Sequence, residues 1–231
     1  MHYQNTLRST ETNIDNLGRL IHMAFLVLVR HGQSQLNLEN RFSGWIDTPL
    51  SRTGKQEAHE CAKKISGFEF DAAYTSDMVR SVETLDIILG DIRQSGIRIS
   101  KSRAINERGY GKLQGKNKDY VRRIYGKEQV RIWRRSYDAR PPGGESLADT
   151  AARALPFFKK RILADVKNGK NVLVVAHGNS LRSILMYLDK LAKKDVMELN
   201  ISTGVPYIYE IDGRGHVKGK EILQKQTKDN F

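Results

Sequence analysis

Two histidines of this 231-residue chain each follow a short apolar run and precede a glycine. His31 follows residues 24–29 and Arg30, and His177 follows residues 172–176. Such runs are typical of buried strands, and open α/β sheets place their ligands at the carboxyl ends of strands. Two imidazoles that meet there beside arginines suit phosphoryl chemistry, because one ring can accept the phosphate while the other stabilises its charge.

The tripeptide Arg30-His31-Gly32 contains the residue types that covalent phosphate transfer needs. One imidazole nitrogen can attack phosphorus while a hydrogen bond to the other nitrogen fixes the tautomer. Gly32 lets a phosphate approach the backbone, and Arg30 can bind phosphate oxygens with two N–H groups. The tripeptide alone is a weak signal, since a histidine at a strand end often bonds only to nearby carbonyls.

The elements that would position these residues alternate between strand and helix. Strands are expected at residues 24–29, 70–74, 97–99, 171–176 and 205–211. Helices are expected at residues 53–66, 76–89, 119–125, 128–137, 146–167 and 180–188. Thr53 and Gln56 form a capping-box pattern, Ser76 can cap the next helix, and Pro156 is expected to kink or restart its helix. The alternation predicts an α/β fold, a three-layer α/β/α sandwich with a mostly parallel central sheet and helices on both faces.

The first 22 residues are polar and resemble neither a signal peptide nor a transit peptide. Because Met23 directly precedes the first strand, we expect residues 1–22 to be a disordered leader and residues 23–231 to form a single domain. No apolar run approaches the roughly 20 residues that span a bilayer, so no membrane association is expected. Cys61 is the single cysteine, which excludes an intrachain disulfide and favours a cytoplasmic location.

The net charge of +13 is concentrated in one stretch. Residues 93–140 contain fifteen Lys or Arg against four Asp or Glu. This excess indicates a polyanionic partner, either nucleic acid or a multiply phosphorylated small molecule. The tyrosines and the tryptophan of the stretch match no standard motif for single-stranded nucleic acid, and a solvated basic face is the plain alternative.

Other kinds of active site find little support in the sequence. No further histidine has a metal-ligand spacing to His31 or His177, so we expect no metal. There is no GxxxxGK[ST] or GxGxxG nucleotide loop, and Ser34 lacks the GxSxG elbow of a hydrolase nucleophile.

Seven segments together indicate which family of phosphoryl-transfer proteins the chain resembles. They are Arg30-His31-Gly32-Gln33-Ser34-Gln35-Leu36-Asn37, Asn40-Arg41-Phe42-Ser43-Gly44-Trp45, Tyr74-Thr75-Ser76-Asp77-Met78-Val79-Arg80, Asn106-Glu107-Arg108-Gly109-Tyr110-Gly111, Trp133-Arg134-Arg135, His177-Gly178-Asn179-Ser180-Leu181-Arg182 and Thr203-Gly204-Val205-Pro206. In this order they closely resemble the cofactor-dependent phosphoglycerate mutases of the histidine phosphatase superfamily, over essentially all of residues 24–211. Arg-His-Gly with a late His-Gly marks the superfamily alone, and the other segments point to the mutase branch.

The resemblance assigns a role to each candidate residue. It implies that His31 becomes a phosphohistidine, that His177 stabilises the transferring group, and that Glu107 is the general acid and base. Around the phosphate it implies Arg30, Arg80, Asn37 and the backbone N–H of Gly178. For substrate binding it implies Arg108, Tyr110, Lys118, Arg134 and Arg135, together with the motif residues Ser43, Gly44 and Asn179. By itself, Glu107 would more often be a surface ion-pair partner of Arg108.

The activity implied is interconversion of 2-phosphoglycerate and 3-phosphoglycerate, a step of glycolysis and gluconeogenesis, primed by 2,3-bisphosphoglycerate and without metal. The expected partners are small phosphorylated three-carbon acids rather than nucleic acid or membranes. A broad-specificity phosphatase of the same superfamily is the nearest alternative, since it would use the same two histidines. A non-catalytic polyanion-binding protein is the alternative from a different class.

Three positions depart from the family pattern. Gln33 stands in place of Glu, Leu36 in place of Trp, and Gly109 in place of His. Gly109 matters most, because it is expected to loosen the loop that must hold Glu107 and Tyr110. We expect activity to survive, since the nucleophile and the proton carrier are unchanged. The connection from residue 140 to residue 146 is short for the family, which leaves homo-oligomerisation open.

Overall fold

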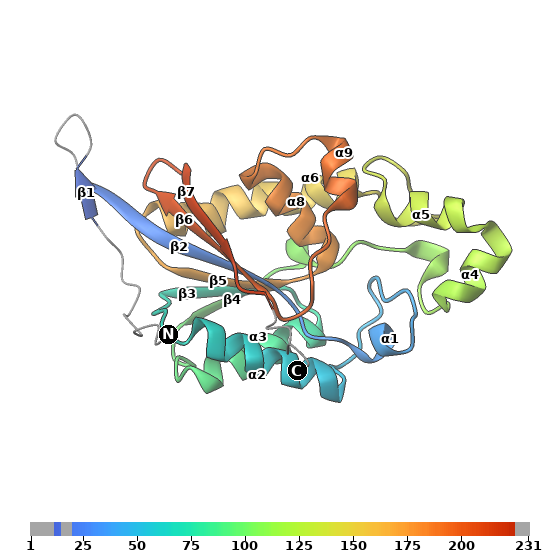
Figure 1. Cartoon of the computed structure of the whole chain (residues 1–231), viewed down its shortest axis with the longest axis horizontal. Coiled ribbons are helices and arrows are strands. Elements are labelled where there is room, and N and C mark those ends of the chain that lie inside the picture. Colours follow the sequence, from blue (N-terminus) through green and yellow to red (C-terminus); the bar gives the residue numbers. More distant parts are fainter. Residues whose placement is uncertain (1–11, 15–19, 225–231) are drawn as a thin grey trace, which may run out of the picture.

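The computed structural model of the chain describes residues 12–14 and 20–224 (Figure 1). Over these residues one sheet has the strand order β4-β3-β5-β2-β6-β7, with β1 paired to β2. Its strands are β1 (Thr12–Ile14), β2 (Leu20–Arg30), β3 (Ala72–Thr75), β4 (Arg98–Lys101), β5 (Val172–Ala176), β6 (Pro206–Asp212) and β7 (Val217–Ile222). Strands β4, β3, β5 and β2 are parallel, whereas β6 is antiparallel to β2 and to β7. The predicted mostly parallel sheet is confirmed.

Helices cover both faces of the sheet, as expected for a three-layer sandwich. The α-helices are α1 (Gln35–Leu38), α2 (Arg52–Ile65), α3 (Val79–Asp91), α4 (Lys118–Tyr125), α5 (Lys127–Arg135), α6 (Leu147–Phe157), α7 (Leu163–Lys167), α8 (Gly178–Leu188) and α9 (Lys193–Glu198). Short 3₁₀ turns η1 (Arg103–Ile105) and η2 (Gly111–Leu113) lie between β4 and α4, and a π-helical turn η3 (Phe158–Ile162) joins α6 to α7. Figure 1 shows α2 and α3 below the sheet and α6 and α8 above it.

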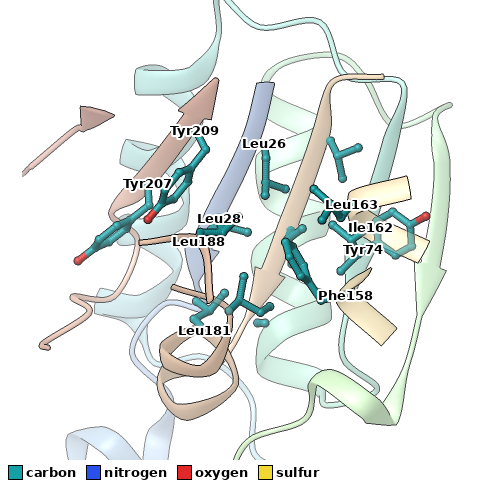
Figure 2. Packing of buried hydrophobic residues seen from close by; sticks show 14 of the residues in the cluster. Leu26, Leu28, Tyr74, Phe158, Ile162, Leu163, Leu181, Leu188, Tyr207 and Tyr209 are labelled. Atoms are coloured by element: carbon teal, nitrogen blue, oxygen red, sulfur yellow. The ribbon is translucent and has the colours of Figure 1, made fainter. Parts of the chain in front are cut away.

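Alternation along the central strands explains the two layers of core. In β2, Leu26 and Leu28 belong to the cluster between the sheet and the layer of η3, α7 and α8. Val27 and Val29 belong to the cluster between the sheet and the layer of α2 and α3. Successive side chains of a strand point to opposite faces, so a continuous apolar run is needed where both faces are covered. Figure 2 shows the first cluster, in which Leu26 and Leu28 lie among Phe158 and Leu181.

Several helix boundaries differ from the sequence prediction. The N-cap of α2 is Ser51, whose side chain accepts a hydrogen bond from Gly54 N, so the capping box predicted at Thr53 is wrong. Ser76 does not cap α3; the N-cap is Met78, without a side-chain bond, because the Ser76 hydroxyl bonds to a histidine instead. Pro156 acts as expected, since the π-helical turn begins two residues after it.

The proposed leader falls mostly outside the described residues. Where it is described, Thr12–Ile14 pairs antiparallel with residues 20–22, so β2 begins before the predicted strand start. The domain boundary at Met23 stays a prediction.

Beyond the carboxyl ends of the strands, α4 and α5 form a separate lobe of residues 117–135 (Figure 1). It has its own small core, in which Val121 and Val130 pack with Phe42 and Leu113. Within the described part of the chain, no helix is long and apolar enough to cross a bilayer.

Candidate active site

Strand register brings the two predicted histidines together. In the parallel pairing of β2 with β5, Arg30 is opposite Ala176, so His31 and His177 leave the sheet side by side. The His31 N–H donates to the Ala176 carbonyl at 3.0 Å. The ring centroids are 4.9 Å apart at an interplanar angle of 60°, and both rings are buried. The two rings are therefore close enough for both to contact one phosphoryl group.

The tautomer of His31 follows from its neighbours. Its Nδ1 lies 2.6 Å from the Gly32 carbonyl oxygen, which can only accept, so Nδ1 carries the proton. Arg80 Nε donates to His31 Nε2 at 3.3 Å. Nε2 is therefore the nitrogen with the lone pair, and it is the nucleophile if this ring reacts.

His177 is fixed by a serine. Ser76 Oγ lies 2.7 Å from His177 Nε2 and accepts a hydrogen bond from Met78 N. In the arrangement where the Ser76 hydroxyl donates to Nε2, the ring proton of His177 lies on Nδ1. His177 Nδ1 is buried without a hydrogen-bond partner among the described residues. It is a donor available to an anion.

Both imidazoles are neutral at neutral pH. Burial is the main cause that lowers the pKa of His31 well below 6.5, and the charges of His177, Arg80 and Arg30 add to it. Burial likewise lowers the pKa of His177 well below 6.5, with Arg80, Arg30 and Arg153 contributing. A neutral His31 can attack phosphorus without first losing a proton.

Gly32 has a packing role that the sequence did not predict, and its role in phosphate approach stays a prediction. A Cβ at this position would lie 2.2 Å from the Gly54 carbonyl oxygen. The residue therefore lets the start of α2 pack against the loop after His31, and this close approach holds the backbone of the nucleophile.

Arginines surround the histidine pair. Arg80 is fully buried, and its guanidinium donates to the Ile46 and Gly44 carbonyls. Burial lowers the pKa of Arg80 to about 10, so it stays charged at neutral pH. Arg30 donates from Nη1 to the Ile201 carbonyl at 2.8 Å.

Most of the orphaned buried polar atoms of the described residues lie in this region. They are Arg30 Nε, Arg108 Nε, Arg108 Nη1 and His177 Nδ1, with Thr48 Oγ1 as the remaining one. An unpaired buried N–H costs about 1–3 kcal/mol, so a group of such donors indicates a site built for an anion. Among the described residues, the Arg108 guanidinium donates from Nη2 alone, to the Tyr110 hydroxyl and the Arg134 carbonyl.

Glu107 is a buried carboxylate with one occupied and one free oxygen. Oε1 accepts from Arg108 N at 2.8 Å and from both the backbone and the side-chain nitrogen of Asn179 at 3.0 Å. Oε2 has no hydrogen-bond partner among the described residues, and Glu107 lines the cavity. Burial raises the pKa of Glu107, but these bonds and the charges of Arg30 and Arg80 outweigh it and keep the pKa below its ordinary value. The surface ion pair considered from sequence is not formed.

A cavity of about 110 Å³ lies close to the histidine pair, since Arg30 and Gly178, the chain neighbours of His31 and His177, are part of its lining. Predicted residues in its lining are Arg30, Asn37, Ser43, Gly44, Glu107, Tyr110, Lys118, Arg134, Arg135, Gly178 and Asn179. The other predicted residues, which are His31, Arg80, Arg108 and His177, are buried and do not belong to this lining. Burial is the main cause that lowers the pKa of Lys118 and of Arg134, with neighbouring cations as the next cause for Lys118. This cavity therefore contains far more positive than negative charge.

The sequence interpretation missed four lining residues, which are Arg41, Phe42, Arg182 and Asn200. Arg182 stands at the end of the His-Gly-Asn-Ser-Leu-Arg segment, and that position was its one signal. It donates from Nε to the Leu199 carbonyl and from Nη1 to Asn179 Oδ1. Asn200 lies in the loop after α9 and has no pattern that could have identified it. Across the described residues, no three His, Cys, Asp or Glu side chains converge as metal ligands.

Comparisons with known proteins agree with this geometry. The family model of the histidine phosphatase superfamily (branch 1) matches residues 26–220. A protein from Parvibaculum lavamentivorans named 2,3-bisphosphoglycerate-dependent phosphoglycerate mutase is 54% identical over 200 residues, covering 86% of this chain and 95% of the relative. One of the same name from Bradyrhizobium diazoefficiens is 52% identical over 197 residues, covering 84% and 95%.

Solved structures show the same fold. YhfR from Bacillus stearothermophilus superposes with a TM-score of 0.74 at 28% identity, covering 84% of this chain and 94% of that one. A phosphoglycerate mutase from Bacillus anthracis str. Sterne has a TM-score of 0.71 at 24% identity, covering 85% and 91%. The chain belongs to the histidine phosphatase superfamily, branch 1, and within it to the 2,3-bisphosphoglycerate-dependent phosphoglycerate mutases.

Proposed function

We propose that this chain interconverts 2-phosphoglycerate and 3-phosphoglycerate through a phosphohistidine at His31, primed by 2,3-bisphosphoglycerate. The observation that supports this most is the pair of neutral imidazoles 4.9 Å apart beneath a strongly cationic cavity. The kinship with mutases at 54% and 52% identity supports the same reaction.

Priming begins with attack of His31 Nε2 on a phosphorus atom of the bisphosphate. The N–P bond forms while the bond from phosphorus to the sugar-acid oxygen breaks, and Glu107 Oε2 gives that oxygen a proton. Arg80 Nε donates to His31 Nε2 before the reaction and passes to an oxygen of the phosphoryl group as the N–P bond forms. The Nδ1–H of His177 can donate to another oxygen of the same group. Donors already held in place need no reorganisation as charge develops, which is the main requirement of phosphoryl transfer.

The return step uses the same groups in reverse. A hydroxyl of the bound monophosphate attacks the phosphorus on His31, and Glu107 accepts the hydroxyl proton. The bisphosphate that forms turns within the cavity and then donates its other phosphate to His31. Water must stay out during this turn, because hydrolysis of the phosphohistidine would make the protein a phosphatase.

The proton affinity of Glu107 must change as the reaction proceeds. Without an anion, hydrogen bonds to Oε1 and two arginines keep its pKa below its ordinary value. A phosphate beside Oε2 adds negative charge, and like charges favour the protonated carboxyl group. Binding of the bisphosphate therefore supplies the acid form that priming needs.

Cations of the lining suit the rest of the substrate. Lys118 and Arg134 are both partly buried and line the cavity with Arg135 and Arg182. A bisphosphorylated three-carbon acid is small and highly negative, so several close cations favour it over a neutral phosphoester. Small phosphorylated three-carbon acids are the partners we assign to this cavity.

Phosphorus NMR tests the proposal directly. The parent and a His31→Ala variant are incubated with 3-phosphoglycerate, with and without 2,3-bisphosphoglycerate. We expect primer-dependent appearance of 2-phosphoglycerate for the parent and none for the variant. Inorganic phosphate as the main product would overturn the proposal in favour of a phosphatase, and an unchanged spectrum would favour a non-catalytic binding protein.

A further inference from the structure

The loop that carries Glu107 has little regular structure of its own. Residues 106–110 lie between the turns η1 and η2 and form no helix or strand. Gly109 adds a peptide with no side chain to anchor it, and glycine is the most flexible residue. The position of Glu107 must therefore be set by contacts from elsewhere in the fold.

Arg153, on α6, supplies two of these contacts and a third to the turn before the loop. Its Nη1 donates to the carbonyls of Ala104 and Asn106 at 3.0 Å, and its Nη2 donates to the Glu107 carbonyl at 2.8 Å. Its Nε and Nη2 also bind both carboxylate oxygens of Glu145 at 2.9 Å. The Arg153 guanidinium thus ties the backbone of Glu107, and the backbone just before it, to helix α6.

Glu145 completes the restraint on the other side of Glu107. Its Oε2 accepts from Gly109 N at 2.8 Å, and its own backbone N–H donates to the Gly109 carbonyl at 2.8 Å. Trp45 Nε1 donates to the Glu107 carbonyl at 2.6 Å, so that oxygen has two donors. The side chains of Arg153 and Glu145 are each 22% exposed, which makes the pair less screened than a surface ion pair.

We propose that Arg153 and Glu145 are positioning residues for proton transfer by Glu107. They do not touch the reacting atoms; they fix the peptides on both sides of Glu107, so that Oε1 stays on its three donors and Oε2 faces the cavity. The pair thereby replaces the stiffness that Gly109 removes. This inference rests on the proposed role of Glu107 and extends it to residues outside the cavity lining.

A comparison of two phosphate donors isolates this role. An alkyl phosphate such as 2,3-bisphosphoglycerate leaves as an alkoxide and needs a proton from Glu107. The p-nitrophenolate anion is stable and leaves without a proton. Formation of phosphohistidine from each donor is followed by rapid alkaline quench and intact mass, so neither reading depends on complete turnover.

The variant Arg153→Gln should slow phosphorylation by 2,3-bisphosphoglycerate about 10- to 100-fold, since a misplacement of about 1 Å costs up to roughly 100-fold. Phosphorylation by p-nitrophenyl phosphate should change less than about threefold, which also shows that the variant is folded. Glu145→Gln, which can still accept from Gly109 N, should give a smaller effect in the same direction. The matched control is Arg140→Gln, which removes the exposed bidentate pair with Asp149 and should affect neither donor.

Equal slowing with both donors in Arg153→Gln would overturn the inference, because it would show general damage to the site. Rates at the parent level with both donors would also overturn it. The proposed function fails by a different result, namely a parent that yields mainly inorganic phosphate from 3-phosphoglycerate. In that case the ratio of the phosphorylation rates with 2,3-bisphosphoglycerate and p-nitrophenyl phosphate would still show whether Arg153 and Glu145 position Glu107.

Discussion

Acid should destabilise this protein through its two buried imidazoles. Both histidines have pKa values well below 6.5 in the folded protein, chiefly because of burial, and regain the ordinary value on unfolding. As the pH falls below 6.5, the two imidazoles bind protons in the unfolded chain but not in the folded chain. Their full contribution to the free energy of unfolding is therefore present above pH 6.5, and it is lost as the pH falls toward the folded-state pKa. From pH 7.5 to 5.5 the loss is about 1.4 kcal/mol for each ring and about 3 kcal/mol for both.

Urea denaturation at several pH values between 7.5 and 5.5 measures this loss. Carboxyl groups contribute little in that window, because Glu107, Asp165 and Asp212 have pKa values below their ordinary ones and titrate at lower pH. Replacement of either His31 or His177 by Gln should remove about half of the pH dependence.

A third replacement, His59→Gln, is the matched control, because His59 is exposed and bonded to Asp91. This control should still show the fall in the free energy of unfolding that His31 and His177 cause between pH 7.5 and 5.5. If His31→Gln shows the full pH dependence of the parent, His31 takes up protons equally in the folded and the unfolded protein, and burial does not keep the ring neutral. The assignment of Nε2 as a ready nucleophile would then be refuted.

Three further substitutions test other parts of the site. Ser76→Ala removes the hydroxyl that holds His177. A hydrogen bond worth about 1 kcal/mol predicts that phosphohistidine forms about fivefold more slowly in single-turnover assays. An unchanged rate would contradict the tautomer argument. Glu107→Gln should slow phosphorylation by 2,3-bisphosphoglycerate about 100- to 10,000-fold but leave circular dichroism unchanged, and parent-level rates would exclude Glu107 as the proton carrier. Gly32→Ala places a Cβ 2.2 Å from the Gly54 carbonyl oxygen. It should lower the free energy of unfolding, measured in urea, by about 1–3 kcal/mol. Stability equal to that of the parent would show that α2 can shift to make room.

Strand periodicity and the two histidine segments were sufficient to predict the central features of the molecule. The apolar run before each histidine indicates a strand buried on both faces, and this places both rings at one edge of the sheet. The length and register of β2 were not predictable, because they depend on its pairing with β1, β5 and β6. Strand β7 and helix α9 were missed for the same reason, since each short segment is stabilised by tertiary contacts.

Side-chain partners that lie far apart in the sequence limited the prediction of the site. Ser76 looks like a helix cap, yet its hydroxyl bonds to His177, 101 residues away. Burial alone would raise the pKa of Glu107, but hydrogen bonds from Arg108 and from Asn179, 72 residues away, help to keep it below its ordinary value. Such competition between local and distant partners is decided by tertiary packing.

The separate core of the α4–α5 lobe bears on how new specificities could arise. The sheet and the loops at its edge position the imidazoles, whereas Lys118 and Arg134 reach the cavity from a lobe whose small core is distinct from the two sheet cores. Mutations in this lobe can therefore alter which molecules are admitted while leaving the transfer machinery intact. Grafting of residues 117–135 together with their core partners Phe42 and Leu113 is accordingly a practical route to enzymes with redesigned selectivity.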